Sequence, residues 1–118
     1  MNYEFVHEEG FLIIRLSGTA RVNERLLAKE SLTPYLQQSH QKVIIDLKNL
    51  TENGGVYIVG VLNTIKKEFE LLKSGVVLCA LKPELDRYFQ ENRLDQIFDI
   101  GLSVESTKQR FKEKNDDG

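Results

Sequence analysis

The stretch Lys42-Val43-Ile44-Ile45-Asp46-Leu47 decides the fold of this chain. Its centre is an unbroken run of β-branched residues, which is typical of a strand whose two faces are both covered by the protein. The segment that follows, residues 48–55, is polar and ends in two glycines, so we expect a loop there. The sequence therefore predicts a buried central strand that leads into an exposed loop.

Two further strands and a helix are expected on the N-terminal side of this stretch. Residues 11–16 are apolar and β-branched and predict a strand, to which residues 3–7 pair through a tight turn. Residues 23–38 carry apolar side chains at helical spacing and predict an amphipathic helix. Asn23 is its expected N-cap, and Pro34 should kink the helix or separate its last turn.

On the C-terminal side, apolar side chains at helical spacing from Val56 to Leu72 predict a long amphipathic helix that ends at Ser74-Gly75. The elements expected after it are a buried strand over residues 76–81, a helix opened by Pro83, a short strand over residues 97–100 and a last helix capped by Ser103. Buried strands that alternate with helices indicate an α/β fold with parallel strand pairs. We expect one domain over residues 1–111 and a flexible charged tail over residues 112–118.

Composition excludes several classes of function. The chain has 118 residues, 41% of them hydrophobic and 29% charged, as in an ordinary soluble domain. Its net charge of −2 gives no general attraction to nucleic acid or to anionic lipid. No apolar run approaches the roughly 20 residues that span a bilayer, and no secretory signal opens the chain. We therefore expect a cytoplasmic protein that does not insert into membranes.

The side chains that usually carry chemistry do not form a recognisable set. The single cysteine, Cys79, lies in an apolar run and is expected to be a buried, inert thiol. His7 and His40 are far apart, lack metal-ligand spacing and are expected at the surface. Asp46 precedes the predicted loop and should bond its amides, and Gly54-Gly55 either binds an anion or only makes a turn. We predict no catalytic residue, cofactor or metal, and therefore no enzyme.

Five segments together resemble the STAS domains of anti-sigma factor antagonists, which are bacterial regulators. The central block, residues 42–50, and the following Val59-Gly60-Val61-Leu62 are similar to the family's core signature. Further likenesses lie in residues 11–18, 75–85 and 94–98, so the resemblance covers nearly the whole chain. It implies a mixed sheet of four to five strands with about four helices mostly on one face. It also implies function through a protein partner rather than through catalysis.

The sequence departs from the family pattern at the loop before the long helix. The antagonists carry Asp-Ser-Ser-Gly there, and a partner kinase phosphorylates one of the serines, which breaks the complex. Here the stretch is Thr51-Glu52-Asn53-Gly54-Gly55-Val56-Tyr57-Ile58, and it contains no serine. The acceptor position falls on Val56 or Tyr57, depending on where one extra loop residue is placed. The resemblance therefore implies that the phosphorylation switch is absent.

The expected partner surface is the loop and the first part of the long helix. The residues predicted to contact a partner are Glu52, Asn53, Gly54, Gly55, Val56, Tyr57, Asn63, Lys66 and Lys67. Tyr57 suits an interface anchor, although it could equally pack on the domain's own core. The resemblance leaves several partners open: an anti-sigma factor with a kinase fold, another STAS protein or a second copy of this chain. A structural subunit of a signalling or lipid-transport complex is the alternative function.

Overall fold

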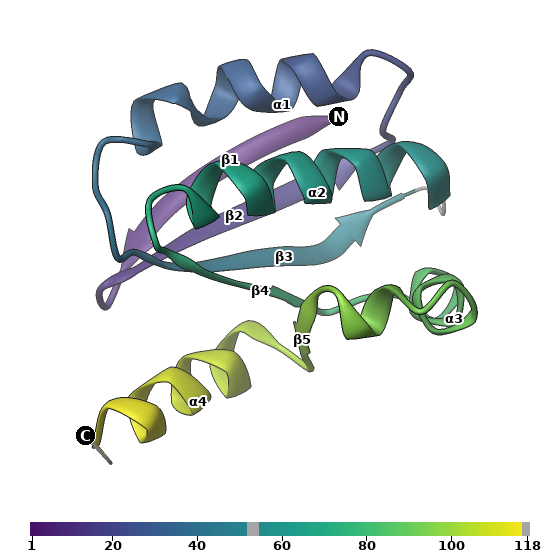
Figure 1. The fold of residues 1–118 in the computed structure, drawn as a ribbon. Coiled ribbons are helices and arrows are strands. Elements are labelled where there is room, and N and C mark those ends of the chain that lie inside the picture. The colour runs from purple at the N-terminus through teal and green to yellow at the C-terminus, as the bar shows by residue number, and fades with distance from the viewer. Residues whose placement is uncertain (52–54, 117–118) are drawn as a thin grey trace.

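The computed structural model describes residues 1–51 and 55–116, with side chains over residues 1–51 and 57–113. A single sheet has the strand order β1-β2-β3-β4-β5; β1 is antiparallel to β2, and every other pair is parallel (Figure 1). In chain order the elements are β1 (Asn2–Glu8), β2 (Phe11–Gly18), α1 (Glu24–Leu32), η1 (Thr33–Tyr35), β3 (Lys42–Leu50), α2 (Gly55–Glu70), β4 (Gly75–Cys79), α3 (Pro83–Glu91), η2 (Leu94–Gln96), β5 (Asp99–Gly101) and α4 (Val104–Asp116). The predicted mixed α/β fold is confirmed.

The two faces of the sheet bury different sets of side chains. Val43, Ile45 and Leu47 of β3 belong to the main core, together with buried residues of α1, α2 and α3. Ile44 of β3 points to the opposite face, into a smaller core that α4 covers with Val104 and Phe111. Helices therefore lie mostly on one face, with α4 on the other (Figure 1). Because both faces of β3 are covered, the residues at its centre are all apolar and do not alternate with polar residues.

Strand β3 is longer than the sequence predicted, because it continues through Leu50 instead of ending at Leu47. Its pairing with β2 shifts within the strand: Arg15 pairs with Asp46, but Ser17 pairs with Asn49. This bulge absorbs one extra residue and lets the ladder resume, so polar residues that we expected in the loop lie in the strand. The loop over residues 48–55 was therefore predicted too long.

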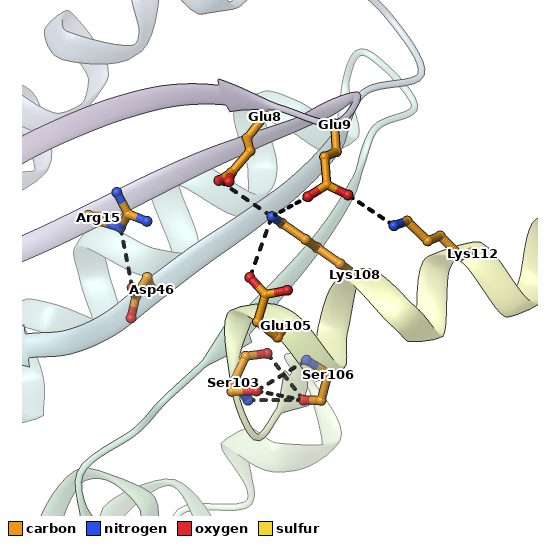
Figure 2. Close-up of polar contacts among 9 residues, drawn as sticks. All are labelled: Glu8, Glu9, Arg15, Asp46, Ser103, Glu105, Ser106, Lys108 and Lys112. Atoms are coloured by element: carbon orange, nitrogen blue, oxygen red, sulfur yellow. Dashed lines mark hydrogen bonds and ion pairs between the residues drawn. The ribbon is translucent and has the colours of Figure 1, made fainter.

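Asp46 lies inside β3, not at its end, and its carboxylate is held on two sides. Its Oδ1 accepts a hydrogen bond from the backbone N–H of Lys48 at 3.0 Å, and its Oδ2 lies 3.6 Å from Nε of Arg15 (Figure 2). Arg15 also reaches Glu4 of β1 at 3.2 Å. The expected structural role of Asp46 agrees with these contacts, which support the bulge.

The expected break and caps of the first and last helices can be compared with the structure. Helix α1 ends at Leu32 and Pro34 lies in a separate 3₁₀ turn, as expected. Asn23 does precede α1, but its side chain makes no capping hydrogen bond. Ser103 does cap α4, because its Oγ accepts the N–H of Ser106 at 3.1 Å (Figure 2).

Strands β4 and β5 occupy fewer or different residues than the sequence predicted. Strand β4 ends at Cys79, and the next residue, Ala80, has a φ of 61° that takes it out of the strand conformation. Strand β5 begins only at Asp99, because the N–H of Phe98 still donates to the carbonyl of Leu94 at 2.9 Å. The Phe98 ring packs instead against Phe89, with 5.6 Å between ring centroids.

A group of charges fastens α4 to the turn between β1 and β2. Lys108 is almost fully covered, and its Nζ lies 3.4 Å from Glu8, 3.3 Å from Glu9 and 3.6 Å from Glu105 (Figure 2). Lys112 adds a contact of 3.0 Å to Glu9. Helix α4 continues to Asp116, so the backbone of residues 112–116 is helical. We call Glu8, Glu9, Glu105, Lys108 and Lys112 the α4 charge cluster.

Burial alone would lower the pKa of Lys108, but its hydrogen bonds to Glu9 and Glu8 and the nearby carboxylate charges outweigh burial and raise the pKa. Hydrogen bonds from Lys112 and Lys108, together with their charges, lower the pKa of Glu9 below its ordinary value of 4.5. The carboxylate of Glu9 is thus favoured in the folded state. Its contribution to stability is complete above the unfolded pKa and is lost as the pH falls through the lower, folded pKa.

Glu9→Gln should therefore reduce the dependence of stability on pH below about 4.5, because glutamine cannot gain the proton that weakens the cluster. We expect the free energy of unfolding of the variant to fall less steeply than that of the wild type as the pH decreases. Urea unfolding at several pH values measures this. Glu91→Gln, at an exposed residue of α3, is the control and should follow the wild type. Identical curves for Glu9→Gln and the wild type would contradict the assignment.

Gly101 of β5 is expected to tolerate no side chain. A Cβ at this position would lie 2.3 Å from Oγ1 of Thr107, which is buried beneath it in α4. Gly101→Ala should lower the free energy of unfolding by about 1–3 kcal/mol through overpacking. Gly75→Ala in β4 is the matched control, since its Cβ would meet its nearest neighbour at an ordinary 3.7 Å. Chemical denaturation measures the free energy of unfolding of both variants. Equal free energies for the two variants would contradict the predicted clash with Thr107.

Candidate partner-binding surface

The carboxyl ends of the parallel strands meet at one edge of the sheet, and the candidate surface lies there. The N–H of Thr51 donates to the carbonyl of Gly18 at 3.1 Å, which ties the chain leaving β3 to the end of β2. A hollow of about 350 Å³ lies between the end of β3 and the start of α3. It is lined by Leu47, Leu50, Thr51, Lys82, Pro83, Glu84 and Leu85. This edge therefore combines a mostly apolar hollow with charged groups.

Helix α2 begins at the same edge, and Tyr57 lies in its first turn. The Tyr57 side chain is 46% exposed, whereas Ile58, Val61 and Leu62 are buried in the main core. Its ring is thus available to a partner and is not absorbed by the domain's own core. Glu52, Asn53 and Gly54 lie outside the described residues. Gly55 and Val56 are described by their backbone only.

The predicted contact residues further along α2, which are Asn63, Lys66 and Lys67, do not all lie on the same side of the helix as Tyr57. At 100° per residue, Lys67 lies within a quarter turn of Tyr57, but Asn63 is a third of a turn away and Lys66 is on the opposite side. Lys66 forms an ion pair with Glu70 one turn on, which occupies its ammonium group. A single flat contact can therefore include Tyr57 and Lys67 but not Lys66. A binding role for these residues stays a prediction.

Tertiary structure brings together residues that the sequence keeps apart. His7 and His40 line one depression of about 350 Å³ at the opposite, amino edge of the sheet. No local pattern could have indicated this, because one lies in β1 and the other precedes β3. Within the described part of the chain, no three His, Cys, Asp or Glu side chains gather as a metal site would require.

The sequence also gave no sign of a buried carboxylate in α1. Glu24 is only 2% exposed, and its Oε2 accepts a hydrogen bond from the hydroxyl of Tyr3 at 2.5 Å. Burial, this hydrogen bond and the charge of Glu24 raise the pKa of Tyr3. A lone glutamate at the start of a helix is usually solvated, so only the position of β1 beside α1 reveals the pair.

A family model identifies the chain. The STAS domain model matches residues 2–107, which include every strand of the sheet. The chain belongs to the STAS domain family. No curated protein matches this STAS chain in a comparison of sequences. Over residues 1–51 and 55–116, none of its helices has the length and apolar character required to cross a membrane.

Solved structures of low sequence identity share the fold. A Thermotoga maritima protein described as an anti-sigma factor antagonist superposes with a TM-score of 0.76 at 15% identity, covering 92% of each chain. The anti-sigma factor antagonist SpoIIAA in its unphosphorylated form gives 0.69 at 16% identity, with 95% of this chain and 97% of that chain covered. A chain of the stressosome, a signal integration and transduction hub, gives 0.70 at 17% identity, with 95% and 98% covered.

Cys79 is expected to be unreactive in the folded STAS domain. It is fully buried, and burial together with the charge of Asp46 raises the pKa of its thiol to about 12. Ellman's reagent at pH 8 should label the native protein far more slowly than the denatured protein. Ser39→Cys in a Cys79→Ala background, at an exposed position, is the control and should react at once. Rapid labelling of native Cys79 would show that the α4 face opens readily.

Proposed function

We propose that this STAS protein is a non-enzymatic regulator that binds a protein partner through the start of α2 and the adjoining sheet edge. The observation that carries the proposal is the 46% exposure of Tyr57 in the first turn of α2. In a helix whose apolar side chains otherwise fill the core, a half-exposed tyrosine has the character of an interface anchor. The mostly apolar hollow at the same edge of the sheet offers a partner a further contact. An anti-sigma factor with a kinase fold is the partner that membership of the family favours.

The partner would be bound without a phosphorylation switch. A phosphate adds about −1.5 to −2 charges and would disrupt a surface that has to pack against another protein. The acceptor position falls on Val56 or Tyr57. Valine has no hydroxyl to modify, and tyrosine has one but does not suit a kinase that phosphorylates serine. Binding is then constitutive, with Glu52 supplying a fixed negative charge to the loop.

A second candidate function is that of a structural subunit in a multi-protein signalling particle or a lipid-transport complex, bound to another STAS protein or to a second copy of itself. The missing serine favours this candidate too, because a permanent subunit needs no release step. Similarity to a stressosome chain supports the fold such a subunit would need, and nothing beyond it. The identity of the partner separates the two candidates.

Tyr57→Ala should weaken binding of the partner about tenfold or more, as truncation of an interface anchor does. The partner is first recovered by affinity capture from the native cell and is then purified, and its affinity for each variant is measured by calorimetry. Ile97→Ala removes another exposed apolar side chain, away from α2, and should bind like the wild type. A kinase-fold protein as partner supports the first candidate, whereas STAS proteins or transporter subunits support the second. Equal affinities of the two variants would refute the surface.

The absence of the switch has its own test. Incubation of the purified chain with ATP and candidate anti-sigma kinases should leave residues 51–58 unmodified, as read by mass spectrometry. The unphosphorylated antagonist SpoIIAA serves as the positive control for kinase activity. Stoichiometric phosphate on a single residue of this segment would overturn the proposal of constitutive binding.

A further inference from the structure

Apolar side chains line a groove between α1 and α2 that the domain itself leaves uncovered. Val22 is 76% exposed and Leu26 is 62% exposed, and both border a depression of about 510 Å³. Helix α1 buries a different stripe in the core, which includes Ala28 and Leu32. Neighbouring exposed apolar side chains of this size mark a surface that another molecule covers.

Helix α2 contributes the other wall of the groove. Thr64, Lys67 and Glu68 line it, and at 100° per residue they lie within one arc of the helix. Leu71 continues the same arc, because its N–H still donates to the carbonyl of Lys67 at 3.2 Å. Leu71 is 79% exposed and follows the residues of α2 that line the groove.

The charged side chains of the groove are mostly cationic. Arg25, Lys29 and Lys67 line it, against one carboxylate, Glu68. Lys29 pairs with Glu68 at 3.5 Å, whereas Arg25 and Lys67 form no ion pair within the part of the chain that the structure describes. A chain of net charge −2 thus presents a locally positive groove, which is complementary to an acidic partner.

Gly60 fixes where one of these cations lies. A Cβ at Gly60 would come within 2.9 Å of Cδ and 3.3 Å of Cγ of Arg25, so the aliphatic part of Arg25 crosses α2 at a residue that has no side chain. The stem of Arg25 therefore rests against the helix and its guanidinium group remains beside the groove. The packing against Gly60 therefore holds the guanidinium group of Arg25 in place before a partner binds.

We infer that the groove between α1 and α2 is a second docking surface, which receives an acidic amphipathic helix of a protein partner. The apolar stripe of that helix would cover Val22 and Leu26, and its carboxylates would pair with Arg25 and Lys67. Two helices with a groove between them offer the apolar seat that amphipathic helices use in recognition. The surface uses residues other than the start of α2 and thus goes beyond the proposed function.

Three fluorescent, stapled helical peptides test the inference. They share one leucine stripe, and their remaining positions are mostly Glu, mostly Gln or mostly Lys. By fluorescence polarisation the acidic peptide should bind at least tenfold more tightly than the Gln peptide, and the Lys peptide more weakly than either. Arg25→Glu and Lys67→Glu should each weaken the acidic peptide roughly tenfold, since a like charge replaces an attraction. Leu26→Ser should weaken it as well.

Matched variants separate the groove from general charge effects. Lys48→Glu makes the same change of net charge at an exposed residue of β3, and Ile97→Ser removes an exposed apolar side chain elsewhere; both should bind like the wild type. Circular dichroism verifies that each variant is folded. Failure of the acidic peptide to bind, equal binding of all three peptides, or an equal loss with Lys48→Glu would overturn the inference. The readout uses peptides, so this outcome and that of the Tyr57→Ala experiment are independent.

Discussion

The structure depends on β3 being covered on both of its faces. Val43, Ile44 and Ile45 have no exposed surface, and they contact helices on opposite sides of the sheet. Because β3 pairs in parallel with β2 and β4, each connection has to return along a face of the sheet, and α1 and α2 do so on the same face. The carboxyl ends of the strands, the start of α2 and the hollow beside α3 consequently share one edge. The candidate site exists because of that constraint.

The two faces are stabilised in different ways. The main core holds most of the buried side chains, whereas the smaller core on the α4 face has Phe11, Ile13, Ile44 and Cys79 as its buried residues. A thin apolar contact is supplemented there by the α4 charge cluster, whose lysine Lys108 touches three carboxylates. Electrostatic contacts of this kind vary with pH in a way that apolar burial does not. The stability of α4 should therefore be the part of the fold most sensitive to acid.

The proposed binding surfaces differ in how they would be controlled. In the proposed function, a partner at the start of α2 would meet Tyr57 within a segment that has no serine, so phosphorylation of a serine there would not release it. A partner in the α1–α2 groove would be held by Arg25 and Lys67, whose attraction weakens as salt screens it. Both surfaces include residues of α2: Tyr57 lies in its first turn, and Thr64, Lys67 and Glu68 lie about two to three turns further on. One protein could therefore occupy both surfaces, or two proteins could bind side by side.

The sequence by itself determined the order of elements, the buried strand at residues 42–47, the break at Pro34 and the cap at Ser103, because these depend on side-chain periodicity and on groups only a few residues apart. It also determined that residues 51–58 contain no serine. Tertiary structure alone decided the bulge that extends β3, the placement of His7 and His40 around one depression, the packing of Arg25 on Gly60 and the ion pairs of Lys108 with Glu8 and Glu9. Each of these depends on the register or packing of segments that are distant in the chain, and local propensities do not encode such contacts.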